Sequence, residues 1–184
     1  MDTHCILFNS KNLGYMELQK SLLAYIGKCL LTTGETISMT ESVTAGFLQF
    51  SFSQMKDASK FFKGGITAYT LEEKVRFLDI DEHEAKECDC VSPHISDTMA
   101  LRVAQLFKTD WSIAITGYAT PVKESGNQIF AYFSFTHQGK IILSTKLDLH
   151  PKTEAMHAQL YYSEYIFGCL KVQLEKYLLL KQGN

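Results

Sequence analysis

The stretch at residues 36–46 reads TISMTESVTAG, and a second stretch at residues 66–74 reads ITAYTLEEK. In the first, polar and apolar residues alternate as in a short strand, which leads into Ser42 at the turn toward a helix. In the second, a strand ends just before Thr70, which opens a helix as its N-cap while Glu73 completes a capping box. A strand that runs directly into a helix, repeated along the chain, is typical of α/β folds.

The rest of the chain continues this alternation of helices and strands. Apolar residues recur with helical spacing in four more segments, while short alternating or continuously apolar runs predict further strands. The predicted helices cover residues 16–33, 46–55, 92–107 and a closing segment from Pro151, and the predicted strands cover residues 36–40, 66–69, 111–115, 129–136 and 140–149. The last two strands form a hairpin around Gln138-Gly139. We therefore predict an α/β fold, a three-layer sandwich with a mixed sheet between helical layers.

Two of the helices carry signals of how they begin and pack. Ser92 is placed to cap the helix over residues 92–107, and Pro93 follows in its first turn. The closing helix has an apolar stripe that should face the core. This stripe consists of Met156, Leu160, Phe167, Leu170, Leu174 and Leu178.

The composition is that of one ordinary globular domain. The chain has 184 residues, of which 46% are hydrophobic and 21% charged, and a single core suits this size. The formal net charge of −2 and the scattered basic residues argue against nucleic-acid binding. We also expect no membrane span, because no run reaches ~20 apolar residues, and no signal peptide, because the N-terminus lacks its basic and apolar regions.

The cysteines and histidines point to neither disulfides nor a metal site. Five cysteines without a recognisable spacing argue against a disulfide framework and favour a reducing, cytoplasmic compartment. A group of four potential zinc ligands lies close together in the sequence, but C-x-C with these histidine spacings matches no common zinc site. The group consists of His83, Cys88, Cys90 and His94. We predict no metal and no cofactor.

Ser42 and Lys74 are the residues with the clearest chemical potential. Ser42 precedes a helix, whose outward-pointing backbone N–H groups could stabilise an oxyanion or hold a phosphate. A lysine whose pKa is lowered by burial can act as the base that a serine nucleophile needs. Each residue also has an ordinary structural interpretation. Ser42 could be only a helix cap, and Lys74, beside Glu72, Glu73 and Arg76, could be one of a run of solvated charges.

Four segments, in their order and spacing, resemble the C-terminal domain of the CinA family. The family's motifs read approximately A-E-S-C-T-G-G, Y-S-N-E-A-K, V-S-x-x-V-x-x-x-M-A and A-V-T-G-I-A-G-P. The corresponding segments of this chain are residues 40–46, 69–74, 91–100 and 113–121. The resemblance implies a single CinA C-terminal-like domain over residues 1–184, in which residues 1–15 are an N-terminal extension. We expect no molybdopterin-binding-like domain of the kind that precedes it in many relatives.

The resemblance also implies an activity, because the enzymatic members of the family are nicotinamide-nucleotide amidases. They convert nicotinamide mononucleotide to nicotinate mononucleotide and ammonia through a serine acyl-enzyme. By this resemblance Ser42 is the nucleophile and Lys74 the base, and the Tyr69 hydroxyl relays the proton or orients the lysine. The implied substrate-binding residues are Thr44, Gly46, Gly65, Thr116, Gly117, Lys152 and His157.

The chain departs from the family pattern around the expected substrate. The loop motif G-I-A-G-P-D-G-G is replaced by GYATPVKE at residues 117–124, so we expect Tyr118 or Thr120 to fill part of a nucleotide pocket. The family's arginines at the start of the last helix are absent, and Lys152 and His157 lack the planar fork that suits a phosphate. These changes are compatible with an altered specificity or with a non-catalytic binding or scaffold homologue.

We expect two kinds of partner. The first is a small pyridine nucleotide, in line with the implied activity. The second is another copy of the chain, because the first and closing helices carry more apolar residues than a small monomer readily hides and because family members associate. We therefore predict a homodimer that binds neither nucleic acid nor membranes.

Overall fold

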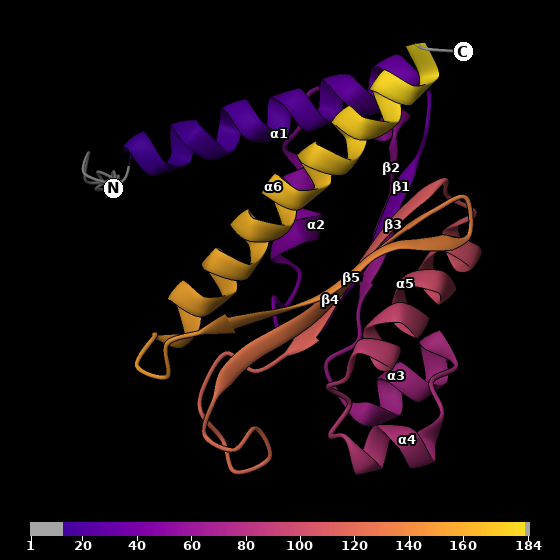
Figure 1. Cartoon of the computed structure of the whole chain (residues 1–184). Coiled ribbons are helices and arrows are strands. Elements are labelled where there is room, and N and C mark those ends of the chain that lie inside the picture. Colours follow the sequence, from indigo (N-terminus) through magenta and orange to yellow (C-terminus); the bar gives the residue numbers. More distant parts are fainter. Residues whose placement is uncertain (1–12, 183–184) are drawn as a thin grey trace, which may run out of the picture.

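The computed structural model describes residues 13–182, and its helices and strands are shown in Figure 1. The strands are β1 (Ile37–Glu41), β2 (Phe62–Thr67), β3 (Trp111–Gly117), β4 (Ile129–His137) and β5 (Lys140–Leu149). The helices are α1 (Leu13–Thr33), α2 (Phe47–Ser53), the short 3₁₀ helix η2 (Ala58–Lys60), α3 (Leu71–Leu78), α4 (Glu82–Glu87), α5 (Pro93–Phe107) and α6 (Ala155–Gln182). None of these helices is both long and apolar enough to cross a membrane.

The five strands form one mixed sheet in the order β2-β1-β3-β4-β5. β1 is parallel to both of its neighbours, and the chain returns to each through helices, as parallel strands require. β3, β4 and β5 are antiparallel, and a two-residue turn joins β4 to β5. Gln138 and Gly139 take φ values of 50° and 70° in this turn, the left-handed values of a type I′ turn, so the predicted hairpin is confirmed.

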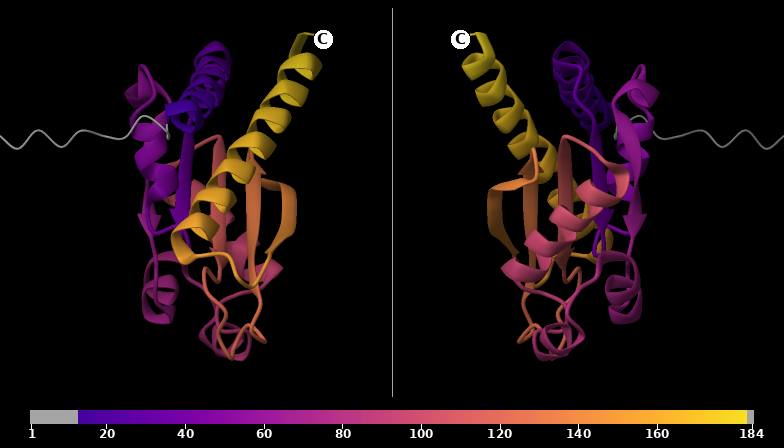
Figure 2. Two further views of the ribbon diagram at one scale, coloured as in Figure 1. Left: turned by 90° about the vertical axis from the view of Figure 1, so that its left-hand side faces the viewer. Right: turned by 90° about the vertical axis from the view of Figure 1, so that its right-hand side faces the viewer.

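Helices cover both faces of the sheet. The two views of Figure 2 show α6 in front of the sheet from one side and α5 in front of it from the other. On the first face, Leu30 of α1 and Phe52 of α2 join Phe167 of α6 in a buried apolar cluster. On the second face, Met99 and Val103 of α5 belong to a separate buried cluster. The predicted three-layer α/β sandwich is therefore confirmed.

The carboxyl ends of the parallel strands lie at one edge of the sheet. β1 ends at Glu41, β2 at Thr67 and β3 at Gly117, and the register of the sheet pairs Glu41 with Thr67 on one side and with Ile115 on the other. Ligands of open α/β sheets bind outside these carboxyl ends. The same edge is the place where Ser42 and the segment before α3 follow their strands.

The closing helix begins later than the sequence predicts. Pro151 lies in a turn closed by a hydrogen bond from the Thr153 N–H to the His150 carbonyl, and α6 begins at Ala155. Proline is favoured both at the second position of such a turn and in the first turn of a helix. Pro151 alone therefore does not show whether the chain forms a turn or begins a helix there. The apolar stripe is correspondingly shorter at its start, because Met156 is 64% exposed whereas Phe167 is buried.

Candidate active site

Ser42 and Lys74 are in direct contact at the carboxyl edge of the sheet. Lys74 Nζ donates a hydrogen bond of 3.0 Å to Ser42 Oγ and one of 3.2 Å to the backbone carbonyl of Tyr69. Both side chains are buried, with exposed fractions of 6% for Ser42 and 3% for Lys74. Ser42 directly follows β1 and Lys74 lies in the first turn of α3, which follows the neighbouring parallel strand β2. The topology therefore joins two residues that are 32 positions apart.

Burial changes the proton affinity of Lys74. The loss of solvation lowers the pKa of its ammonium group from the ordinary value of 10.5, while the nearby Cys90 thiol and Asp89 carboxylate act in the opposite direction. A lower pKa makes the neutral amine easier to reach near neutral pH. A neutral amine 3.0 Å from a serine hydroxyl has the position and the protonation state that a general base requires.

Ser42 is held as a continuation of the sheet and does not cap α2. Its N–H donates to the carbonyl of Ile115 on the adjacent strand β3, at 3.1 Å. The chain then turns through Ala45 and Gly46, with φ values of 52° and 98°, before α2 begins at Phe47. The N-cap is Gly46, so the interpretation of Ser42 as a simple helix cap is wrong.

The backbone donors at the start of α2 do not point toward Ser42. They are occupied by the carboxylate of Glu41, which is fully buried. Glu41 Oε2 accepts hydrogen bonds from the N–H groups of Gly46 and Leu48, and Oε1 accepts one from the N–H of Gln49. The expectation that this helix terminus serves an oxyanion or a phosphate is therefore wrong, because an internal anion already fills it. An acidic residue immediately before the turn, Glu41, was the feature of the sequence that could have indicated an internal partner for these N–H groups.

Tyr69 contributes to the site through its backbone. Its carbonyl accepts the hydrogen bond from Lys74, whereas its ring is 67% exposed at the rim of the site. Within residues 13–182, no hydrogen bond joins the Tyr69 hydroxyl to Ser42 or Lys74. The structure therefore supports a serine–lysine pair and does not bring the tyrosine hydroxyl into it.

A cavity of about 500 Å³ opens onto this pair. Its wall is formed by the turn after β1, the segment from Tyr69 to Lys74, residues 89–91, the loop after β3 and the start of α6. Gln159 of α6 closes one side, and its Nε2 donates to the carbonyl of Val43 at 2.8 Å. A larger hollow of about 710 Å³ lies between α1 and α2 but includes neither Ser42 nor Lys74. The smaller cavity is the candidate active site because it contains the reactive pair.

Two of the predicted substrate-binding residues line this cavity. Thr116 and Gly117 lie in its wall at the end of β3, where Thr116 Oγ1 donates to the carbonyl of Cys90 at 2.8 Å. This bond ties the two loops on either side of the cavity together. The prediction that Tyr118 or Thr120 fills part of the pocket is consistent with their positions, since both residues also line it.

The other predicted binding residues lie outside the cavity. Thr44 donates its hydroxyl to Glu41, and with Gly46 it borders a separate hollow beside α2. Gly65 lies within β2, where an added Cβ would come within 2.5 Å of the Met39 carbonyl oxygen, so its role there is close packing. The predicted binding positions Lys152 and His157 are both exposed, and neither is part of the wall.

Two acidic side chains in the wall were missed by the sequence analysis. Asp89 accepts a hydrogen bond of 2.9 Å from the Tyr118 hydroxyl, which joins the loop before α5 to the loop after β3. Glu124 lines the same cavity from the second loop. Both residues come from irregular segments with no motif of their own, so only the folded structure shows that they line the same cavity as Ser42.

Three of the four potential zinc ligands have other partners, and His83 Nδ1 lies 3.6 Å from the carboxylate of Glu87. His94 Nδ1 contacts the carboxylate of Glu84 at 2.8 Å, and Cys88 Sγ donates to the Glu84 carbonyl. Within the part of the chain that the structure describes, no three His, Cys, Asp or Glu side chains are grouped so that they could hold a metal ion.

Comparison with known proteins identifies a family for this arrangement. The family model described as the CinA C-terminal domain matches residues 19–160. A CinA-like protein of Rippkaea orientalis is 37% identical over 102 residues, which are 55% of this chain and 24% of that protein. A competence-damage inducible protein of Streptococcus pneumoniae is 32% identical over 146 residues, which are 78% of this chain and 35% of that protein. The chain thus spans about a quarter to a third of the length of these curated relatives.

Solved structures share the fold. The crystal structure of a CinA superfamily protein from Klebsiella pneumoniae aligns with a TM-score of 0.79 and 20% identity, over 86% of this chain and 98% of that one. A CinA superfamily protein from Escherichia coli aligns with a TM-score of 0.74 and 19% identity, over 95% of this chain and 98% of that one. At these identities the likeness establishes the architecture alone.

Proposed function

Because the chain belongs to the CinA C-terminal domain family, we propose that it is an amidohydrolase in which Ser42 is the nucleophile and Lys74 the general base. The observation that carries this proposal is the 3.0 Å contact between Lys74 Nζ and Ser42 Oγ at the floor of a cavity. A nucleophile within hydrogen-bond reach of a base, with that base fixed by a third group, is the arrangement common to covalent hydrolases. Here the third group is the Tyr69 carbonyl, which accepts from Lys74.

The reaction uses Lys74 twice, each time first as the acceptor and then as the donor of one proton. Neutral Lys74 takes the hydroxyl proton as Ser42 Oγ attacks the carbonyl carbon of a carboxamide. The resulting ammonium then returns that proton to the leaving nitrogen, so that the C–N bond breaks and ammonia departs from an ester on Ser42. A water molecule loses a proton to Lys74 and attacks the ester. Lys74 then returns that proton to Ser42 Oγ as the acyl C–O bond breaks, which releases the carboxylic acid product and restores the Ser42 hydroxyl. No step needs a metal or a redox partner.

We propose nicotinamide mononucleotide as the first substrate to test, since the family resemblance implies it. The products would be nicotinate mononucleotide and ammonia. The alternative is a binding or scaffold homologue that keeps the fold without turnover. What favours this alternative is the absence of the family's arginines before α6, where the chain has Lys152 and His157 outside the cavity.

Ammonia release from nicotinamide mononucleotide tests the proposal directly. Ser42→Ala should reduce kcat by at least about 1,000-fold, and Lys74→Met by about 100- to 10,000-fold, because each removes one half of the catalytic pair. The double variant should be little worse than Ser42→Ala, since residues that act as a unit are not additive.

Matched controls separate chemistry from general damage. Ser53→Ala and Lys63→Met make the same kinds of change at exposed positions away from the cavity and should retain activity. Activity that survives Ser42→Ala, or that a chelator abolishes, would exclude the serine mechanism. Complete absence of ammonia release from the intact chain would favour the non-catalytic homologue.

A further inference from the structure

The cavity is acidic apart from the lysine of the catalytic pair. Among the described side chains that line it, three are charged, namely Lys74, Asp89 and Glu124. Lys74 is buried at the floor, where Ser42 Oγ and the Tyr69 carbonyl take its hydrogen bonds. The two carboxylates lie nearer to solvent and are exposed. A ligand that enters from solvent therefore meets two negative charges before it reaches Ser42.

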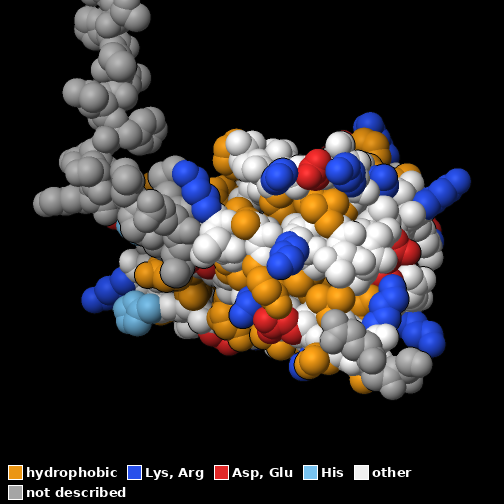
Figure 3. Space-filling view, turned by 90° about the horizontal axis from the view of Figure 1, so that it is seen from above, with side chains coloured by type: hydrophobic (Ala, Val, Ile, Leu, Met, Phe, Trp, Pro, Cys, Tyr) orange, Lys and Arg blue, Asp and Glu red, His pale blue; other side chains and the backbone are white. Residues whose placement is uncertain are grey.

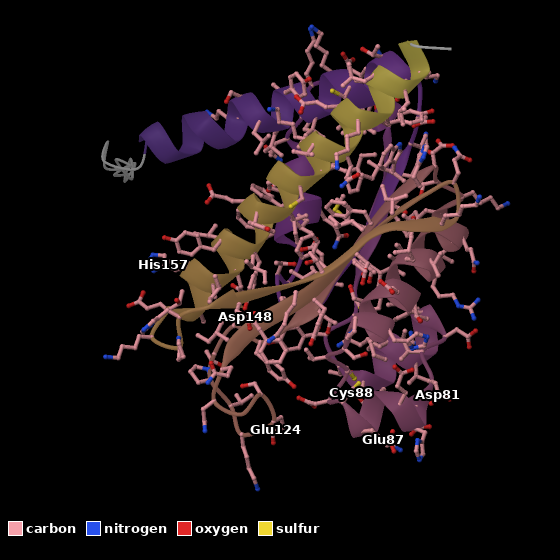
Figure 4. The ribbon with its side chains drawn as sticks, viewed as in Figure 1. Asp81, Glu87, Cys88, Glu124, Asp148 and His157 are labelled. Carbon is pink, nitrogen blue, oxygen red and sulfur yellow. The ribbon has the colours of Figure 1, made fainter. Side chains whose placement is uncertain are left out.

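Asp89 is held in place at this entrance. Its backbone has a φ of 49°, in the left-handed region, and its carboxylate accepts from the Tyr118 hydroxyl at 2.9 Å. The Tyr118 ring packs edge-on against Phe130, with 5.3 Å between the ring centroids. Figure 4 shows Glu124 and Cys88, the chain neighbour of Asp89, at the same end of the molecule. The acidic groups are thus contributed by two loops, one of them fixed by a hydrogen bond.

Among the described residues that line the cavity, Lys74 is the one lysine, so no other lysine offsets these charges there. Lys123 precedes Glu124 and Lys152 follows β5, yet both are exposed and neither lines the cavity. The tyrosines Tyr69 and Tyr118 are among the residues that line it. Aromatic faces beside carboxylates attract cations, whereas they offer no donor fork for a phosphate.

We propose that this cavity selects cationic carboxamides that carry no phosphate, such as a pyridinium carboxamide nucleoside, and that Asp89 and Glu124 set this preference. The inference deepens the proposed function and rests on it for the type of carboxamide. A phosphate dianion in the cavity is repelled by both carboxylates, while a pyridinium ring is attracted by them and stacks on the tyrosines.

The test is a binding measurement on the Ser42→Ala protein, which cannot turn the ligand over. Calorimetric titration with nicotinamide riboside and with nicotinamide mononucleotide compares the same pyridinium carboxamide without and with a phosphate. We expect the riboside to bind about tenfold more tightly. Raising the salt concentration should weaken riboside binding and strengthen mononucleotide binding, because it screens an attraction in one case and a repulsion in the other. Equal affinities, tighter mononucleotide binding or no binding of either ligand would overturn the inference.

Charge-neutral variants identify the residues responsible. Asp89→Asn keeps an acceptor for Tyr118 and a residue that tolerates a left-handed backbone, and Glu124→Gln keeps the side-chain length. Each change should reduce the preference for the riboside by about two- to fivefold, the size expected for exposed charges. Glu87→Gln, the same loss of charge at an exposed position outside the cavity, is the matched control and should leave the preference unchanged. An unchanged preference in both cavity variants would overturn the assignment.

Turnover by the intact chain separates the two proposals. If neither ligand releases ammonia while the riboside preference holds, the proposed amidase function fails and the binding inference stands. If nicotinamide mononucleotide is both bound more tightly and hydrolysed, the amidase function stands and this inference fails.

Discussion

Glu41 and Ser42 are neighbours in the sequence but serve opposite sides of the turn after β1. Ser42 Oγ faces Lys74, whereas the buried Glu41 carboxylate receives the hydroxyl of Thr44 at 2.6 Å and three N–H groups at the start of α2. A carboxylate is an acceptor on both oxygens, so it can receive all four donors at once. Glu41 therefore fixes the turn from which Ser42 projects.

Glu41→Gln should lower the free energy of unfolding by about 1–3 kcal/mol. The glutamine amide presents an NH2 group in place of one oxygen, and in either orientation this group meets at least one N–H or O–H donor without an acceptor. Urea denaturation measures the loss. Glu73→Gln, a matched change in α3 at the surface, should alter stability by less than about 0.5 kcal/mol. Equal stability of Glu41→Gln and the intact chain would show that this network does not hold the turn.

Lys74 should make the chain less stable at neutral pH than in alkaline solution. Burial lowers the pKa of Lys74 in the folded chain, whereas in the unfolded chain it keeps the ordinary value of 10.5. Between the two values the unfolded state binds a proton that the folded state lacks, so stability rises as the pH rises through this window. Below the lowered pKa both states are protonated, and the cost of burying the charge is present in full.

Lys74→Met should remove this alkaline rise and stabilise the chain near pH 7 by about 1 kcal/mol or more, as is typical when an apolar side chain replaces a buried charge. Denaturation curves measured at a series of pH values provide the readout, with Lys63→Met as the control at an exposed lysine. A stabilised but inactive Lys74→Met variant is what a catalytic lysine predicts. A destabilised variant at every pH would mean that Lys74 serves packing.

At the scale of elements, the sequence predicts all five strands and the longer helices, but it misses α4 and η2 and places the second strand at residues 66–69 where β2 covers Phe62–Thr67. Ser92 and Thr70 cap α5 and α3 as expected, because a cap is decided by local hydrogen bonds. The start of α6 is different, since Pro151 satisfies both a turn and a helix and the choice depends on what the chain meets after β5. Local signals therefore predict the identity of an element more reliably than its boundary.

The candidate site shows the same difference between local and long-range information. The family resemblance pairs Ser42 with Lys74, and the structure shows the physical reason: they follow neighbouring parallel strands whose carboxyl ends meet. The acidic residues Asp89 and Glu124 are not predictable, because they lie on loops and reach the cavity only through the arrangement of the whole sheet. The Tyr69 hydroxyl was assigned from a motif, and a motif does not distinguish a side chain from the carbonyl that Lys74 uses.

At the scale of the whole molecule, exposed apolar side chains are unevenly distributed. Most large ones belong to the layer of α1, α2 and α6, and Figure 3 shows apolar side chains among lysines and arginines over the end where α1 and the C-terminal part of α6 lie. Among the side chains that the structure describes, the exposed large apolar members of this layer are Tyr25, Leu31, Phe50, Met156, Tyr161, Tyr165, Val172, Leu179 and Leu180. Exposed apolar surface that is gathered on one side is typical of a protein–protein interface.

We predict that the chain forms a homodimer through this layer, with a total interface above ~1,000 Å², the lower bound for a specific contact. Phe50 is 61% exposed and borders, with Met156, one hollow between α2 and α6, so these two side chains are suited to the centre of the contact. Sedimentation equilibrium should give twice the chain mass at micromolar concentration. The Phe50→Ser/Met156→Ser double variant should raise the dissociation constant of the dimer at least about 30-fold, as expected when central interface residues are truncated.

Leu106→Ser is the matched control, because it removes a similarly exposed apolar side chain from α5 on the opposite face of the sheet and should leave the dimer intact. A monomer throughout the concentration range would refute the dimer, and a dimer that the double variant does not weaken would place the contact on another face.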